Sequence, residues 1–439
     1  MIAALAPVAA LLLSVAMLLV GNGLQSTLLP LRAGIEQFSS VQIGVLGSAY
    51  FVGFALGCWR GATVVRRAGH IRAFAAVVAI ASTSALVHSL IQEPVLWWFI
   101  RFLTGACVAI LFMIIESWLN EKATNETRGT VFSVYSAINL AMIAAGQMLL
   151  ATGDPGGFPL FLMASILVSL AAVPVALSRS ESPAPIDHVE LRIGRLFQLS
   201  PVGFFGCLAV GMTNGAFWAL APLFAQQSGV DVGTGFIALF IGISVAAGAL
   251  GQWPLGLLSD RIDRRKVIVA AAALASLSGL ALALFGDISP TVMLLAVFGF
   301  GMFAFPLYAL CVAHANDFVG ADSFVEAASG LLLTWAAGAV IGPVIASALI
   351  AGAGQAGLFY FTAATHLMLV VFVLMRMRRR SAQPVEDKGN FVDAINASTT
   401  LAPVDVTTTA SPNPADAAPE ATPEAPAEDA GAKPEDQRP

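Results

Sequence analysis

The sequence predicts an all-α membrane protein with twelve transmembrane helices, arranged as two six-helix halves that repeat in the same sense. Hydropathy and an internal repeat carry this prediction. Of the 439 residues, 57% are hydrophobic and 11% are charged, and the mean hydropathy is +0.81. A soluble fold of this length cannot bury so much apolar surface, so a bilayer is the expected solvent.

Twelve apolar stretches are each long enough to cross a hydrocarbon core of about 30 Å, at about 1.5 Å per residue. The first has no basic residue before it and is too long for a cleaved signal peptide, so we expect it to be retained as a span. The expected spans are 5–29, 42–65, 73–92, 95–118, 130–151, 158–177, 201–225, 234–258, 267–286, 291–314, 326–351 and 356–376.

Lysine and arginine predict the orientation of these spans. The loops after spans 2, 4, 6 and 8 and the segment after span 12 hold nearly all of them, whereas Arg32 alone falls on the other side. The positive-inside rule therefore places both termini in the cytoplasm. The expected location is the bacterial inner (plasma) membrane, which the chain crosses many times.

Two short phrases, ALGCW at 55–59 and ALGQW at 249–253, indicate an internal repeat with an offset of 194 positions. The offset changes only by small steps along the chain, so the two halves match span by span. An even number of spans in each half gives both halves the same topology. Other pairs at nearly this offset are Asn22 and Asn214, Pro94 and Pro290, Gly105 and Gly301, and Gly146 and Gly342.

The repeat and the composition divide the chain into four parts. Residues 1–177 and 201–376 are the two expected six-helix bundles, and 178–200 is a cytoplasmic linker. Residues 377–439 are rich in Pro, Ala and acids and too poor in apolar side chains to fold, so they are expected to be a disordered tail. This tail supplies much of the acidic charge, which therefore says little about the solute.

The loops after spans 8 and 2 contain related motifs. After span 8 the sequence reads Gly256-Leu-Leu-Ser-Asp260-Arg261-Ile-Asp263-Arg264-Arg265. It resembles the loop signature G-x-x-x-D-R-x-G-R-R of the major facilitator superfamily, with Asp263 where a glycine is usual. The equivalent loop after span 2 keeps its glycine, Gly69, but has Arg66 in place of the acid.

Motifs within the spans extend the resemblance over about residues 5–376. Span 4 contains R-x-x-x-G from Arg101, and span 11 contains G-x-x-x-G-P from Gly338. The phrases GNGLQSTLLPLR, RRAGHIRAF and IIESWLN are most similar to the YcaD-like branch of the superfamily. The resemblance implies a secondary transporter that moves a small solute by alternating access, with its site between the halves. The expected helix-packing residues are Gly105, Gly146, Gly338, Gly342 and Pro343.

Polar residues of spans 1, 4, 7 and 10 are expected to line the cavity in this fold. Arg101 is the strongest candidate, because a charge roughly 9 Å deep in a span is costly unless it faces a protein interior or water. It would bind an anionic group or tune a proton site, or it would snorkel outward to cap carbonyls of a neighbouring helix. The other candidates, each of which could instead serve helix packing, are Asn22, Gln25, Ser26, Thr104, Asn214, Trp218 and Tyr308.

Charged residues at the cytoplasmic ends of the spans are expected to form a gate. A carboxylate is favoured near a helix N-terminus, so Asp260 is expected to dock at Arg128, where span 5 begins. In the first half, Arg66 or Arg67 is expected to pair with Glu326 at the start of span 11. Both pairs would close the cytoplasmic side and favour an outward-open state; the alternative is that these charges only follow the positive-inside rule and cap helices.

Glu116, a buried acid of the first half, completes the expected gate. It either carries a proton or forms an ion pair with Arg128 or Arg264, and the ion pair is the favoured interpretation. The full set of gate residues is Arg66, Arg67, Glu116, Arg128, Asp260, Arg261, Arg264 and Glu326.

The sequence contains no P-loop, zinc-ligand set, nucleophile elbow or nucleic-acid-binding module. We therefore expect no enzymatic activity, no cofactor, no metal and no nucleic-acid partner. The energy source would be an ion or solute gradient, as in proton-coupled efflux or facilitated passage. Two other functions stay open: a non-transporting receptor or scaffold, and an exporter of lipids or amphiphiles. The expected partners are a small-molecule substrate, protons where transport is coupled, and the bilayer, and the chain is expected to be a monomer.

Overall fold

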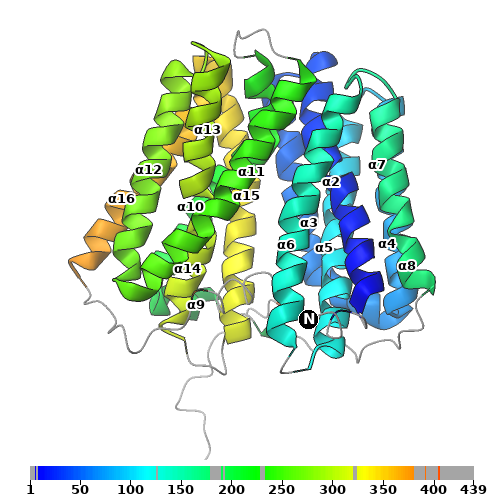
Figure 1. Cartoon of the computed structure of the whole chain (residues 1–439), viewed down its shortest axis with the longest axis horizontal. Helices are drawn as coiled ribbons and strands as arrows, with labels where there is room; N and C mark the ends of the chain where they lie inside the picture. Colours follow the sequence, from blue (N-terminus) through cyan, green and yellow to red (C-terminus); the bar gives the residue numbers. More distant parts are fainter. Residues whose placement is uncertain are drawn as a thin grey trace, which may run out of the picture. The chain divides into compact units, whose positions relative to one another are not determined.

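The computed structural model describes residues 5, 8–124, 127–177, 189–190, 193–227, 233–319, 324–379, 391 and 404–405, all within one compact unit, 1–406. Within these residues, twelve helical segments are long and apolar enough to cross a membrane. The predicted fold class, an all-α membrane protein with twelve spans, is therefore confirmed (Figure 1).

The six spans of the first half are α2 (Ala9–Ile35), α3 (Ser40–Ala68), α4 (His70–Leu90), α5 (Pro94–Lys122), α6 (Arg128–Met148) continued by the 3-10 helix η2 (Leu149–Thr152), and α7 (Pro159–Leu170) with α8 (Ala172–Leu177). The six spans of the second half are α10 (Pro201–Gln227), α11 (Thr234–Arg261), α12 (Arg264–Phe285), α13 (Pro290–Ala304) with α14 (Leu307–Asn316), α15 (Phe324–Ala353) and α16 (Gly357–Met377).

Short elements lie outside the spans. The segment between the halves contains β1 (Val189–Glu190) and α9 (Ile193–Leu199), and β2 (Val404–Asp405) pairs with β1 in parallel. Most of the expected linker and tail lies outside the described residues.

Local sequence explains where several spans begin. The Ser39 hydroxyl accepts a hydrogen bond from the backbone N–H of Gln42, and the Gln42 side chain accepts one from the N–H of Ser39, which forms a capping box at the start of α3. Pro94 and Pro290 occupy the first turns of α5 and α13, where the missing N–H has no helical partner to lose. These prolines are equivalent in the repeat.

Glycines at equivalent positions bring the same helices together in both halves. In the first half, a Cβ atom on Gly146 of α6 would overlap the carbonyl oxygen of Val20 in α2. In the second half, a Cβ atom on Gly342 of α15 would overlap that of Met212 in α10. Met212 follows Val20 by 192 positions, and Gly342 follows Gly146 by 196 positions. Both residues of the second contact are therefore the repeat equivalents of those in the first.

A second pair of contacts repeats in the same way. Gly105 of α5 lies against the carbonyl of Tyr50 in α3, and Gly301 of α13 lies against the carbonyl of Ser244 in α11. Any side chain at either glycine would collide with backbone. The sequence repeat is therefore also a repeat of helix contacts.

Two other expected packing residues lie in α15. A Cβ atom on Gly338 would overlap the carbonyl oxygen of Leu208 in α10. Pro343 stands inside the helix, and its carbonyl faces Gly44 at the start of α3 in the other half. Thus α15 packs closely within its own half and also contacts the first half.

Charge distinguishes the two ends of the bundle. We call the end with the α3–α4 and α11–α12 junctions the basic end, because Arg66, Arg67, Arg261 and Lys266 are exposed there. The opposite end is the one formed by the loops 36–39, 91–93, 286–289 and 354–356.

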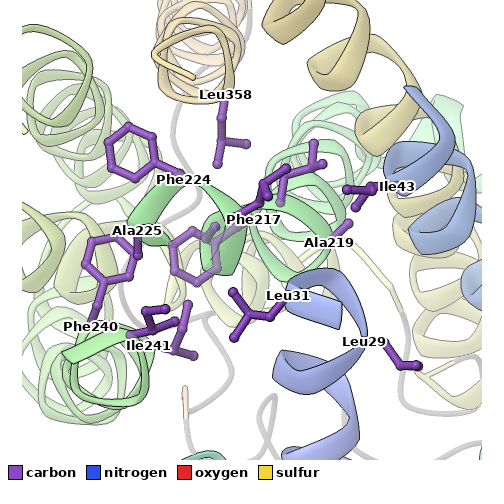
Figure 2. Close-up of a cluster of buried hydrophobic side chains, with 14 of the residues drawn as sticks. Leu29, Leu31, Ile43, Phe217, Ala219, Phe224, Ala225, Phe240, Ile241 and Leu358 are labelled. Atoms are coloured by element: carbon purple, nitrogen blue, oxygen red, sulfur yellow. The ribbon is translucent and has the colours of Figure 1, made fainter. Parts of the chain in front are cut away.

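Buried apolar side chains form one shared core at the opposite end. This core contains members of both halves, among them Leu31, Ile43, Phe217 and Leu358 (Figure 2). A direct hydrogen bond also joins the halves near this end, where the Ser48 hydroxyl of α3 donates to the carbonyl of Val340 in α15 at 2.6 Å.

At the basic end the two halves have separate cores. One large cluster of buried side chains draws only on residues 8–175, and another draws only on residues 196–391. A small cluster around Cys58 and Ala109 of the first half is also contacted by Leu332 of the second. The halves thus share one large core at the opposite end and have separate large cores at the basic end. This differs from the conformation that the expected gate would favour, in which the basic end is the closed one.

The last residues of the two repeated phrases, Trp59 and Trp253, face outward from α3 and α11. Their side chains are 41% and 76% exposed. The guanidinium of the neighbouring Arg60 lies over the Trp59 ring, 4.4 Å from its centroid.

Candidate functional site

A cavity of about 290 Å³ lies between the two halves. Its wall is mostly apolar and aromatic, and it draws on α2, α3, α5 and α6 of the first half and on α10 and α15 of the second. The lining residues are Asn22, Gly23, Ser26, Leu29, Pro30, Ile43, Leu46, Gly47, Tyr50, Phe51, Phe54, Arg101, Phe112, Ile143, Trp218, Ala219 and Trp335.

Among the described lining residues, Arg101 is the one that carries a charge. The residue is only 8% exposed, and its guanidinium carbon lies 4.3 Å from the centre of the Tyr50 ring, within range of a cation–π interaction. Its Nη1 donates a hydrogen bond of 3.4 Å to the side-chain oxygen of Gln25. Both partners are neutral, and the ion pairs found among the described residues do not include Arg101.

The structure places the eight expected cavity residues in different surroundings. Four of them line the cavity: Asn22, Ser26, Arg101 and Trp218. Gln25 lies behind the wall and holds the guanidinium, so it contributes through Arg101.

The other three expected residues lie outside the lining. The Thr104 hydroxyl is buried and donates to the carbonyl of Ile100 in its own helix, at 2.9 Å. Asn214 is buried in α10, and Tyr308 packs beside Trp335 with their ring centres 6.1 Å apart. The sequence alone does not reveal whether a polar side chain hydrogen-bonds to a carbonyl of its own helix or packs behind the wall.

Several aromatic residues of the wall were not predicted, because the lining was expected to come from spans 1, 4, 7 and 10. Tyr50 and Phe51 come from α3, and Trp335 comes from α15. The available signal was Gly53 and Gly105, small residues within one turn of Tyr50 and Arg101, which let α3 and α5 approach closely. Small residues of this kind mark helix interfaces in membranes.

At the basic end, Arg264 is the centre of an ion network in the second half. Its side chain is 1% exposed and contacts Asp260 at 3.0 Å and Asp317, from the end of α14, at 2.9 Å. Its Nη1 also donates to the Ser259 hydroxyl at 2.9 Å. Asp260 therefore has a partner four residues along the chain, and Asp317 is a member of the network that the motif did not predict.

The structure describes the backbone of Arg128 and Glu326 but not their side chains. The expected ion pairs across the two halves therefore remain predictions. Arg66 and Arg67 are exposed, and Arg66 donates to the Thr63 hydroxyl of its own helix at 3.5 Å. Arg261 is exposed as well.

Asp263, which replaces the glycine of the family signature, caps the N-terminus of α12. Its carboxylate accepts a hydrogen bond of 3.0 Å from the backbone N–H of Arg265 and forms an ion pair of 2.8 Å with the guanidinium of the same residue. Burial alone would raise the pKa of Asp263, but the hydrogen bonds and charge of Arg265 outweigh it and lower the pKa below its usual value.

Phe391, from the expected tail, contacts the same loop. Its ring is buried against Gly256, and its backbone N–H faces the Asp260 carboxylate at 3.2 and 3.3 Å. At this residue the expected tail has a fixed contact with the signature loop.

Glu116 is buried in the basic-end core of the first half. Its carboxylate accepts a hydrogen bond of 3.0 Å from the Tyr135 hydroxyl of α6. This contact joins α5 to α6 within one half. Among the described residues, no group of three His, Cys, Asp or Glu side chains is placed to hold a metal ion.

The model of the Major Facilitator Superfamily matches residues 11–323 and, in a second match, residues 203–414. The chain therefore belongs to that superfamily, whose members are transporters and not enzymes.

Curated relatives agree with this assignment over most of the chain. The chain is 26% identical over 380 residues to the uncharacterized MFS-type transporter YcaD of Escherichia coli, covering 86% of this chain and 97% of the relative. An uncharacterized MFS-type transporter of Enterobacter sp. (strain 638) is 26% identical over 381 residues, with the same coverage.

Solved structures show the same fold. The nucleoside transporter NupG has a TM-score of 0.70 and 12% identity, covering 85% of this chain and 99% of that one. A bacterial homolog to the human lysosomal transporter Spinster has a TM-score of 0.68 and 16% identity, covering 86% of this chain and 97% of that one.

Proposed function

We propose that the chain is a secondary transporter that carries a small solute across the bacterial inner membrane by alternating access. The observation that carries the proposal is the position of the cavity, between two halves that share a large core at one end and have separate large cores at the other. In transporters built from parallel repeats, the site lies between the halves, and rocking exposes it to each side in turn.

The basic end is taken as the cytoplasmic end, because lysine and arginine gather there. In that orientation the shared core closes the outer side, and the structure corresponds to an inward-facing state. One comparison supports this state. The similar Spinster homolog is itself described as inward-facing and occupied.

The residues of the cavity wall favour facilitated passage down the solute's own gradient over transport coupled to a proton that binds beside the solute. None of the described lining residues is Asp, Glu or His, so the wall offers no group that normally titrates between pH 4 and pH 8. The alternative proton site is Glu116 with Tyr135, which lies roughly 22 Å from Arg101 along α5. A proton bound there would act on the conformation and not on the solute directly.

The rival function is a receptor or scaffold that holds a solute without moving it. Both functions predict binding, so the discriminating quantity is access to the cavity from each side of the membrane. Ser26 of α2 is a suitable reporter because it lines the cavity. The natural cysteines are all buried and can be replaced to give a background without thiols: Cys58, Cys107, Cys207 and Cys311.

Ser26→Cys in this background is labelled with a membrane-impermeant maleimide in inside-out and in right-side-out vesicles. Alternating access predicts labelling from both sides. A disulfide between Ser48→Cys and Val340→Cys, whose parent residues are joined across the halves by a 2.6 Å hydrogen bond, should block labelling from the outer side only. Ser39→Cys, exposed in an outer loop, is the control that labels from outside with or without the disulfide.

Labelling of Ser26→Cys from the cytoplasmic side alone, regardless of the disulfide, would contradict the proposal. That result describes a bundle that stays in one conformation, as a receptor or scaffold would.

A further inference from the structure

Among the described residues, no acidic side chain forms an ion pair with Arg101. Its contacts are the amide oxygen of Gln25 and the face of the Tyr50 ring, both of which are neutral. A buried cation without an opposite charge is strongly disfavoured, and cation–π contacts offset only part of the penalty. The described lining residues include no Asp or Glu that could supply the missing charge.

The guanidinium also has unused donors. Arginine carries five N–H donors in a planar fork, and Gln25 accepts one of them. Because Arg101 lines the cavity, the remaining N–H groups are available to a solute. A planar fork of this kind matches the two oxygens of a carboxylate or similar anion.

Neutral polar groups near Arg101 come from the same half. Asn22 and Ser26 of α2 line the cavity, and the Ser26 hydroxyl donates to the carbonyl of Gly23 at 2.8 Å, which leaves its oxygen lone pairs free to accept. The polar part of the wall therefore belongs to the first half.

The facing part of the wall is aromatic, and its rings pack against other aromatic rings. Trp218 of the second half stacks on Phe305, with ring centres 5.7 Å apart and planes 11° from parallel. Trp335 meets Phe51 of the first half edge to face at 5.6 Å. Such surfaces bind flat apolar groups, by burial and by ring stacking.

The volume limits the size of the solute. About 290 Å³ is at the lower end of the range for ligand pockets, about 300–1,000 Å³. A small molecule fits this space better than a lipid with two acyl chains.

We propose that the cavity binds a small organic anion with an aromatic or otherwise apolar body, whose anionic group pairs with Arg101 while its body lies against Trp218 and Trp335. The anion supplies the charge that the protein lacks, and binding bridges the two halves. This inference rests on the proposed transport function for its role, but it concerns binding and is tested separately.

Three probes of one shape test the inference: 2-naphthoate, the neutral 2-naphthamide and the cationic 2-naphthylmethylammonium. Their binding to the purified full-length protein in nanodiscs is measured by calorimetry at pH 7.5. A charge-assisted hydrogen bond predicts that naphthoate binds roughly tenfold to hundredfold more tightly than the amide. The ammonium probe should bind most weakly.

Variants assign the preference to one side chain. Arg101→Gln should remove the preference for naphthoate and leave the affinity for the amide nearly unchanged, while Arg101→Lys should keep part of the preference. Arg60→Gln is the matched control, because Arg60 also stacks on an aromatic ring, at 4.4 Å, but lies outside the cavity lining.

Several results would overturn the inference. These are no binding of naphthoate at millimolar concentration, equal binding of the anion and the amide, or displacement of naphthoate by equal concentrations of chloride. If Arg101→Gln does not fold, the three probes on the natural protein and on Arg101→Lys still decide.

The binding test and the labelling test can fail independently. Labelling from both sides without a preference for the anion would support the proposed transport function and reject this solute class. A preference that depends on Arg101, with labelling from one side only, would show an anion receptor and reject transport.

Discussion

The two halves share a scaffold of helix contacts but differ at the depth of the cavity. Arg101 and Gln25 of the first half correspond in the repeat to Val297 and Phe217 of the second. Phe217 stacks on Phe300, the counterpart of Thr104, with ring centres 5.4 Å apart in the shared core. On the same repeated scaffold, the first half has a polar site where the second half has an aromatic core.

The basic-end loops differ in a related way. In the first half, Gly69 takes a backbone φ of 81°, which few residues but glycine adopt, and the arginines beside it are exposed. In the second half, the equivalent residue is Asp263, which caps α12 with a φ of −52°. The first-half loop turns because Gly69 can adopt a positive φ. The second-half loop is stabilised by side-chain contacts around Arg264.

Arg264→Ala tests the second-half network, and the largest effect is expected here. The change leaves Asp317, whose side chain is 2% exposed, without its 2.9 Å contact to the guanidinium. Breaking a buried ion pair by removing one partner costs about 3–5 kcal/mol, so the melting temperature of the purified protein should fall clearly. Arg66→Ala, in the exposed first-half loop, should change it little. Equal effects would mean that the loops are alike after all.

Gly105→Ala and Gly301→Ala test the close helix contact that is repeated in both halves. Each new methyl group would meet a backbone carbonyl of the neighbouring helix, of Tyr50 and of Ser244 respectively. Overpacking of this kind costs about 1–3 kcal/mol, and the two losses of thermal stability should be similar. In Gly129→Ala, where nothing lies within 4 Å of the new atom, stability should stay the same or rise. A loss in one half only would show that the repeated contacts are not equivalent.

Asp263→Ala should have the smallest effect of the three, about 1 kcal/mol for a lost N-cap. Because the pKa of Asp263 is lowered in the folded protein, the contribution of its carboxylate is fully present above about pH 4, the value in unfolded chains. It is lost as the pH falls through the folded pKa. The natural protein and the variant should therefore differ in melting temperature at pH 7, and this difference should be smaller at pH 3. Asp287→Ala, at an exposed position, should change nothing at either pH.

The sequence predicted the twelve spans and the matching of the halves because both follow from patterns along the chain. Hydropathy marks a span directly, and glycines such as Gly146 and Gly342 mark contacts at a constant offset. Arg101 stood out for the same reason, since a charge inside a span is rare.

The rest of the cavity depends on which helices are neighbours, and the chain alone does not encode this in any local pattern. Tyr50 and Trp335 are ordinary aromatic residues until α3 and α15 are placed beside Arg101. In the same way, Asp317 lies 53 positions from Arg264, and only the packing of α12 against α14 makes them partners.

The outward-facing Trp59 and Trp253 have a consequence for how the protein sits in lipid. Tryptophan prefers the boundary between hydrocarbon and headgroups, and these two side chains hold the same place in the two halves. We expect them to mark one level of the membrane, with the last eight or so residues of α3 and α11, roughly 12 Å, extending beyond it. The arginines of one loop and the ion network of the other would then lie among lipid headgroups. The phosphates of an anionic leaflet would be within reach of Arg66 and Arg67, so the surface charge of the lipid would act on the exposed arginines of this loop.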